Sequence, residues 1–113
     1  MDIAQRSMGN VMIVDVTGQI RLGDGDVLLR DKIQSLIQQG YKQIVLNLAG
    51  VSYIDSAGLG EIAHAHATIT RQGGRLKLAG VTKRLHDLLS ITRLLTVFDT
   101  YDNDAEAAAS FGD

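Results

Sequence analysis

The sequence predicts a single α/β domain spanning residues 1–113, with about four helices packed against a mixed, mainly parallel sheet of about five strands. Short apolar runs typical of buried strands alternate with segments whose apolar residues recur at helical spacing. This alternation implies β-α-β units, which pair their strands in parallel. Two strand-like runs at the start are separated by only a few turn residues, which adds an antiparallel hairpin at the N-terminus.

The strands are predicted from apolar or alternating runs of four to six residues, apart from the last pair. Residues 3–7 and 11–16 form the hairpin, joined through Gly9 and Asn10, which both tolerate positive φ. Thr17 and Gly18 begin to break the second strand. The remaining strands are expected at residues 44–48, 75–79 and 97–98.

The helices are predicted from stripes of apolar residues and from their end signals. The first begins at Asp26, the expected N-cap, and ends at Gly40, which suits the left-handed conformation that closes many helices. The second spans residues 59–69 and ends before two glycines at 73–74. A short third helix follows Thr82 as its cap, and residues 104–111 form an alanine-rich terminal helix.

Composition excludes several classes of function. The formal net charge of −2 disfavours nucleic-acid binding through a dense basic surface, and 4% aromatic residues with no Trp disfavour base stacking. Zero Cys removes disulfides and thiol chemistry and fits a reducing compartment. No apolar stretch is long enough to span a bilayer, and no signal peptide is evident. We expect a cytoplasmic protein that binds neither nucleic acid nor membrane.

The most informative stretch is residues 55–60, Asp-Ser-Ala-Gly-Leu-Gly, between the predicted strand 44–48 and the predicted helix 59–69. Ser56 lies where a loop turns into a helix, flanked by residues too small to shield its hydroxyl. The first N–H groups of a helix lack internal partners, and the helix dipole favours anions there. Ser56 is therefore open to four interpretations: a helix cap, a catalytic nucleophile, part of a phosphate-binding loop, or a phosphorylation site.

A serine hydrolase is disfavoured although the residue types are present, namely Ser56, Asp55, His64 and His66. The nucleophile elbow G-x-S-x-G needs glycine two residues before the serine, and Ile54 stands there. His64 and His66 lie on the helix that Ser56 begins, and residues two apart do not share a helix face. We therefore predict no catalytic residues and no enzymatic activity.

Cofactor and metal sites are disfavoured as well. Residues 58–63 fit G-x-G-x-x-[GA], but the preceding strand is predicted to end near Leu48 and no acidic side chain follows in residues 76–81. The pair His64 and His66 has the wrong spacing for zinc, and Asp24 and Asp26 do not complete a calcium loop. We predict no cofactor and no metal.

A helix cap or a modification site remains for Ser56. A cap stabilises a helix by about 1 kcal/mol, and Asp55 alone can provide it. Phosphorylation would add about −1.5 to −2 charges beside Asp55. A helix N-terminus tolerates that charge, whereas a partner presenting apolar or acidic groups would not. The residues therefore favour an exposed binding surface switched by charge without refolding.

Residues 54–60, following the strand at 44–48, closely resemble the signature of the STAS domain of bacterial anti-sigma factor antagonists. The D-S-x-G-L-G string is the specific part of this match. The resemblance extends over nearly the whole chain. It covers the opening hairpin, residues 17–20, the helix from Asp26, the turn at 73–74 before residues 76–78, and residues 94–98.

The resemblance implies a non-enzymatic switch protein that regulates transcription. Such antagonists bind an anti-sigma factor, typically a serine kinase of the histidine-kinase-like ATPase type, and so free a sigma factor. The kinase phosphorylates the serine matching Ser56, which abolishes binding, and a PP2C-type phosphatase restores it. Asp55 is the acidic neighbour of the phosphoacceptor. The partner-binding surface implied around it is formed by Ala57, Gly58, Leu59 and Gly60.

One residue departs from the family pattern. Many members carry an acidic residue just after the G-x-[IL] of the second strand, in a loop facing the serine, whereas here Arg21 follows Ile20. We include Arg21 in the partner-binding surface, because its charge would attract a phosphate on Ser56. Ser52, Thr68 and Thr70 leave a second modification site open. The alternative functions are a STAS module of a stressosome-like or lipid-transport assembly, and a small nucleotide-binding protein.

Overall fold

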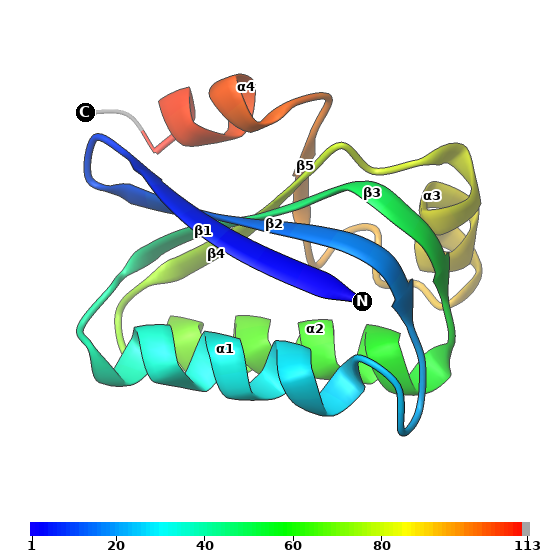
Figure 1. Cartoon of the computed structure of the whole chain (residues 1–113). Helices are drawn as coiled ribbons and strands as arrows, with labels where there is room; N and C mark the ends of the chain where they lie inside the picture. The colour runs from blue at the N-terminus through cyan, green and yellow to red at the C-terminus, as the bar shows by residue number, and fades with distance from the viewer. Residues whose placement is uncertain (112–113) are drawn as a thin grey trace.

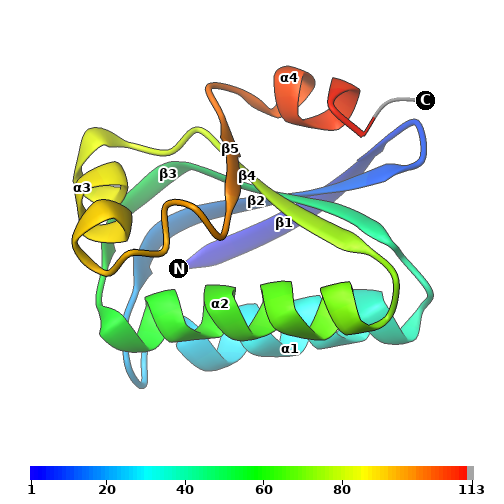
Figure 2. The ribbon, with the colours of Figure 1, turned by 180° about the vertical axis from the view of Figure 1, so that it is seen from behind.

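The computed structural model describes residues 1–111, which form one sheet with helices on both of its faces (Figure 1). The strands are β1 (Asp2–Met8), β2 (Val11–Ile20), β3 (Gln43–Ile54), β4 (Arg75–Ala79) and β5 (Asp99–Tyr101). The helices are α1 (Asp26–Gln38), α2 (Ser56–Arg71), α3 (Lys83–Ile91) and α4 (Asp104–Ala109). The long helices α1 and α2 cover one face, α4 lies over the other, and α3 lies beside one end of the sheet (Figures 1 and 2).

The sheet has the mixed, mainly parallel pairing that the sequence predicts. The strand order is β1-β2-β3-β4-β5. The β1–β2 pair is antiparallel and the other three pairs are parallel. Parallel strands joined by helices bring the carboxyl ends of β2 and β3 to the same edge, where α1 and α2 both begin. The predicted fold class is confirmed.

The core has two parts, one on each face of the sheet. The larger part lies under α1 and α2 and includes the predicted stripe of α1, formed by Leu29, Ile33, Leu36 and Ile37. The smaller part lies under α4 and includes Ile13 and Val45. Residues of β2 enter both parts, which explains why its first half is almost entirely apolar.

Two predicted strand ends are wrong, because β2 continues to Ile20 and β3 continues to Ile54. Residues 17–20 do not break β2 but pass through two shifts of register against β3. The predicted connection from Ala49 is strand as far as Ile54. Gly50 keeps the strands paired, because a Cβ there would lie 2.5 Å from Thr17 Cγ2. Glycine at position 50 therefore allows a close approach of the two strands.

The last predicted strand is also misplaced. Val97 and Phe98 lie in a turn in which both backbone N–H groups donate to Leu94 O, and β5 begins at Asp99. Phe98 is buried although it lies in the turn, whereas Val97 is exposed.

The predicted helix ends need three corrections. α2 runs from Ser56 to Arg71 and is longer than the predicted 59–69, and α4 ends at Ala109 instead of at residue 111. Thr82 caps α3 by accepting from Leu85 N at 3.2 Å, and Gly40 follows α1 with φ of 93°. Asp26, however, is the first residue of α1 rather than its cap, which is Gly25. Its Oδ1 accepts from Gly23 N at 3.0 Å and Val27 N at 2.8 Å, so Asp26 closes the preceding loop.

Candidate functional site

The candidate site lies at the edge of the sheet where α2 begins. Asp55 is the only residue between the end of β3 and the first residue of α2, which is Ser56. The neighbouring loop, residues 21–25, joins β2 to α1 at the same edge. Both segments are therefore presented by the ends of adjacent parallel strands.

Asp55 joins these two segments. Its Oδ1 accepts from Gly58 N at 2.9 Å, which caps α2, and its Oδ2 accepts from Leu22 N at 3.0 Å. Its own N–H donates to Ile20 O at 3.2 Å. The hydrogen bonds from Gly58 and Leu22 hold the pKa of the Asp55 carboxyl below its usual value. The carboxylate is thus a fixed negative charge beside Ser56.

Ser56 is exposed and is not the cap of its helix. Because Asp55 satisfies Gly58 N, α2 does not need the Ser56 hydroxyl for its start. No hydrogen bond found within residues 1–111 involves Ser56 Oγ, whereas Ser52 Oγ donates to Gly18 O and Thr70 Oγ1 to His66 O. Of the hydroxyls considered, Ser56 combines exposure with a position at a helix N-terminus.

The two glycines of the segment have different surroundings. Gly58 is buried, and a Cβ there would lie 2.6 Å from Ile20 O and 2.9 Å from Ile54 Cγ1. Gly60 is exposed, and a Cβ there would have no neighbour within 4 Å. Gly58 lets α2 approach the sheet closely, while the fold gives no packing reason for glycine at position 60.

The six residues expected to contact a partner are not equally accessible. Gly60 and Arg21 are exposed, and Asp55 and Ala57 are half-buried. Gly58 is buried, and Leu59 is only 5% exposed and belongs to the core. Gly58 and Leu59 therefore hold the start of α2 against the core and do not contact a partner directly.

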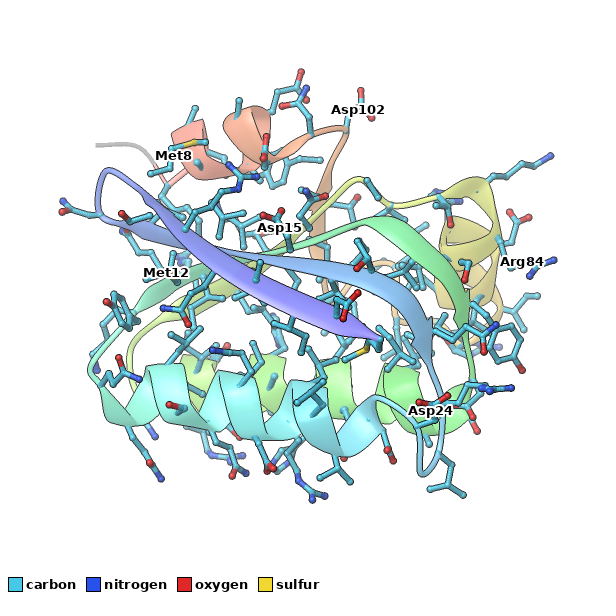
Figure 3. All side chains as sticks on the ribbon, viewed as in Figure 1. Met8, Met12, Asp15, Asp24, Arg84 and Asp102 are labelled. Carbon is cyan, nitrogen blue, oxygen red and sulfur yellow. The ribbon has the colours of Figure 1, made fainter. Side chains whose placement is uncertain are left out.

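Arg21 lies in the loop that Asp55 holds. Its guanidinium pairs with Asp24 at 3.2 Å, and both side chains are exposed. Figure 3 shows Asp24 at this loop, close to the start of α1. The pair is open to water, so it constrains Arg21 weakly.

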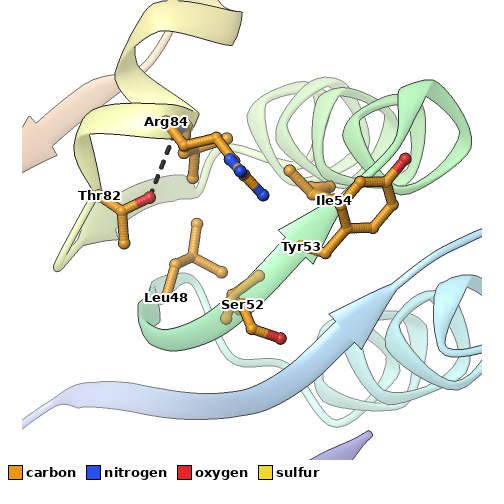
Figure 4. A pocket seen from close by; sticks show the side chains of 8 residues that line it. Leu48, Ser52, Tyr53, Ile54, Thr82 and Arg84 are labelled. Atoms are coloured by element: carbon orange, nitrogen blue, oxygen red, sulfur yellow. Dashed lines mark hydrogen bonds between the residues drawn. The ribbon is translucent and has the colours of Figure 1, made fainter.

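Exposed apolar side chains surround the segment. Leu22, whose N–H binds Asp55, has 76% of its surface exposed, and Tyr53 has 40% exposed. An open pocket of about 170 Å³ lies between the end of β3 and the start of α3. Figure 4 shows Arg84 extending from α3 toward Ile54 and Tyr53 across this pocket. The expected site residues did not include Leu22 or Tyr53, because exposure of an apolar residue leaves no mark in a single sequence.

The structure does not bring together the residues that a serine hydrolase or a metal site would need. His64 is exposed, and His66 packs edge-on against Phe98 with ring centroids 5.2 Å apart. Within residues 1–111, no three His, Asp or Glu side chains gather as a metal site would require. No helix in this range is long and apolar enough to cross a membrane.

The strand before the G-x-G-x-x-A run is longer than predicted, because β3 ends at Ile54 and not near Leu48. The run therefore does follow its strand closely, as a dinucleotide site requires. The acidic residue that such a site also requires is missing, since no acidic side chain lies in residues 76–81. Gly58 also has a different use here, because it packs against the backbone of Ile20.

The chain is similar to known proteins along almost its whole length. The family model of the STAS domain matches residues 3–107. The chain belongs to the STAS domain family. The resemblance found at residues 54–60 is thereby confirmed at the level of the family.

The relatives agree in sequence and in structure. The chain is 35% identical over 99 residues to an anti-sigma-B factor antagonist of Bacillus subtilis, with 88% of this chain and 87% of that protein covered. The crystal structure of an anti-sigma factor antagonist from Mycobacterium paratuberculosis superposes with a TM-score of 0.87 at 19% identity, covering 99% and 94% of the two chains. The Bacillus cell fate determinant SpoIIAA in its phosphorylated form gives 0.77 at 18% identity, covering 97% and 99%. The structural likenesses support the fold.

Proposed function

We propose that this protein is an anti-sigma factor antagonist that binds its partner through the surface around Ser56 and is released when Ser56 is phosphorylated. The observation that supports this most is that the cap of α2 and its exposed hydroxyl are supplied by two different residues. Asp55 caps the helix, which leaves the adjacent Ser56 exposed and not needed as the cap. The 35% identical relative is itself named as an antagonist of an anti-sigma factor.

The charge of a phosphate would act locally. Phosphorylation adds about −1.5 to −2 charges at the first residue of α2, where unpaired N–H groups and the helix dipole stabilise an anion. The new charge would lie beside the Asp55 carboxylate, which already accepts from Gly58 N and Leu22 N. The helix keeps its cap, so the fold survives while the surface becomes strongly negative.

The partner surface combines exposed apolar groups with a small polar centre. Leu22 and Tyr53 offer exposed apolar area in the segments next to Ser56, and the core of an interface favours aromatic and apolar groups over charge. Gly60 leaves room for a partner backbone to come close to α2. A dianion on Ser56 would have to be desolvated in such an interface, which opposes binding.

Arg21 would moderate the phosphorylated state. It is held only by an exposed pair with Asp24, in the loop whose Leu22 N–H binds Asp55. A phosphate on Ser56 would compete for the guanidinium, because Arg binds phosphate oxygens in a bidentate manner. If Arg21→Ala changes neither the stability of phosphorylated protein nor its partner affinity, Arg21 has no part in the switch.

The partner would supply the catalysis. We infer that it is an anti-sigma factor with the kinase activity of a histidine-kinase-like ATPase, which would bring ATP to Ser56, and that a PP2C-type phosphatase would reverse the reaction. This chain then needs no catalytic group of its own. Its contribution is an accessible hydroxyl held at a helix N-terminus.

A pull-down from the cell extract of the source organism tests this function. The baits are wild type, Ser56→Ala and Ser56→Asp, with captured proteins identified by mass spectrometry. Capture of a histidine-kinase-like ATPase by the first two baits and its loss with Ser56→Asp is the expected result. Equal capture of that ATPase by all three baits would contradict the switch, and capture of transport or stressosome components instead would replace the proposed function.

A further inference from the structure

A second polar site lies at the opposite end of the sheet from Ser56. The amino ends of β3 and β4 meet there beneath the end of α4, around a pocket of about 390 Å³. Three basic side chains line the pocket, from Lys42, Arg75 and Lys77, and Gln43 and Ser110 line it as well. The walls thus offer many hydrogen-bond donors, and no Asp or Glu is among the lining residues.

Lys77 is the unusual member of this group. It is only 4% exposed although it carries a charge, and lysine is almost never this buried unless it is paired. Arg75 and Lys77 alternate along β4 with Leu76 and Leu78, so they face α4 while the leucines enter the core under α1 and α2. Lys77 is therefore directed away from the main core and toward the pocket.

Among residues 1–111, the contacts of Lys77 are with a hydroxyl and two aromatic rings and include no carboxylate. Its Nζ donates to Ser110 Oγ at 2.7 Å, and Ser110 Oγ in turn donates to Ala107 O at 2.6 Å. The ammonium also lies 4.4 Å from the ring centre of Phe111 and 5.5 Å from that of Tyr101. Within residues 1–111, no carboxylate forms a salt bridge with Lys42, Arg75 or Lys77.

The cover of the pocket is fixed to the sheet at its other end. Arg6 of β1 pairs with Asp15 at 2.8 Å and also with Asp104, the first residue of α4. This holds the start of α4 over β1 and β2 and leaves its last turn, with Ser110, over Lys77. Figure 1 shows α4 above the hairpin end of the sheet, while α2 begins near the opposite end, beside α3.

We propose that this pocket binds a small phosphate-type oxyanion, free or as part of a phosphomonoester, with Lys77 and Arg75 as its principal ligands. Within residues 1–111 the one hydrogen bond of the Lys77 ammonium is to a hydroxyl, and a buried ammonium gains more from an anion than from water because the interaction is weakly screened. A guanidinium on the same strand face adds a bidentate donor. An uncharged side chain could fill the space under α4 equally well. We therefore attribute the charge at position 77 to the binding of an anion.

Backbone ¹H–¹⁵N NMR titration of the full chain tests this site. Inorganic phosphate is added at constant ionic strength, with chloride as the reference, and glycerol phosphate is titrated in parallel. We expect saturable shifts at residues 73–77 and 110–111 with phosphate and not with chloride. Stronger binding of glycerol phosphate would indicate a phosphomonoester as the ligand, and equal or weaker binding would indicate the free anion.

Three variants make the test specific. Lys77→Met keeps an unbranched apolar stem against Phe111 and should weaken phosphate binding at least about tenfold. Lys77→Arg keeps the charge and should retain binding, which separates loss of the ligand from loss of packing. Lys83→Met removes an exposed charge from α3 and should change nothing. The absence of saturable phosphate shifts, or equal weakening by Lys77→Met and Lys83→Met, would overturn the proposal.

Discussion

The two long helices begin at the same edge of the sheet, yet each uses an aspartate differently. At the start of α1, Asp26 is 7% exposed and lies inside the helix, where its carboxylate binds Gly23 N and Val27 N. At the start of α2, Asp55 lies just outside the helix and binds Gly58 N and Leu22 N. The next residue, Ser56, therefore remains at the surface.

The two helix starts thus differ in whether a polar group remains available to a partner once the helix is capped. At the start of α1, the carboxylate of Asp26 is buried and accepts hydrogen bonds from the preceding loop and from the helix itself. The start of α2 is capped by Asp55 and adds the Ser56 hydroxyl, which makes no hydrogen bond within residues 1–111. The proposed function depends on this spare hydroxyl, and the following changes test each side of the comparison.

The largest effect is expected from filling the close contact beneath α2. Gly58→Val would place side-chain atoms where a Cβ already lies 2.6 Å from Ile20 O. Overpacking of this kind costs about 3 kcal/mol of unfolding free energy. Urea denaturation measures it. A loss too small to detect would mean that α2 does not depend on this close approach.

A somewhat smaller loss is expected at the start of α1. Asp26→Ala removes two hydrogen bonds to a buried carboxylate and should cost about 2 kcal/mol in the same denaturation experiment. The folded variant should lose less partner affinity than stability, because Asp26 is itself buried and acts on the partner surface only by holding Gly23 in the loop that carries Leu22. Loss of partner binding by fully folded Asp26→Ala would show that the two helix starts act as one site.

A change of opposite sign is expected at Gly60. Alanine there meets no atom within 4 Å and should stabilise α2 by up to about 1 kcal/mol. Partner affinity should fall, because the added methyl group obstructs close approach to the helix. Unchanged affinity, measured by isothermal titration calorimetry, would remove Gly60 from the binding surface.

The smallest effect is expected from the charge of Asp55. Its pKa is lowered by the hydrogen bonds from Gly58 and Leu22, so the carboxylate stabilises the fold above its ordinary pKa of about 3.9. That stabilisation is lost as the pH falls through the lowered value. Asp55→Asn should therefore have a lower Tm than wild type near neutral pH, and the gap should close in acid. A gap that persists at the lowest pH would assign the effect to shape and not to charge.

Sequence reasoning recovered the order of the elements better than their ends. The stripe of α1 and the Thr82 cap follow from local periodicity and side-chain chemistry. The ends of β2 and β3 do not, because Gly18 looks like a break and the polar, glycine-containing residues after Leu48 look like a loop until the two strands are paired. The same limit applies at the site, where Ser56 stands out in the sequence. The burial of Leu59 and the exposure of Leu22 depend on packing between distant segments.

The most direct measurement of the central claim is calorimetric titration of the captured partner with three forms of the protein. These are unmodified wild type, wild type phosphorylated at Ser56 and verified by mass spectrometry, and Ser56→Ala. We predict that Ser56→Ala binds like unmodified protein and that phosphorylation weakens binding at least about 100-fold, equivalent to about 2.7 kcal/mol. Equal affinity of the phosphorylated and unmodified forms would contradict the account.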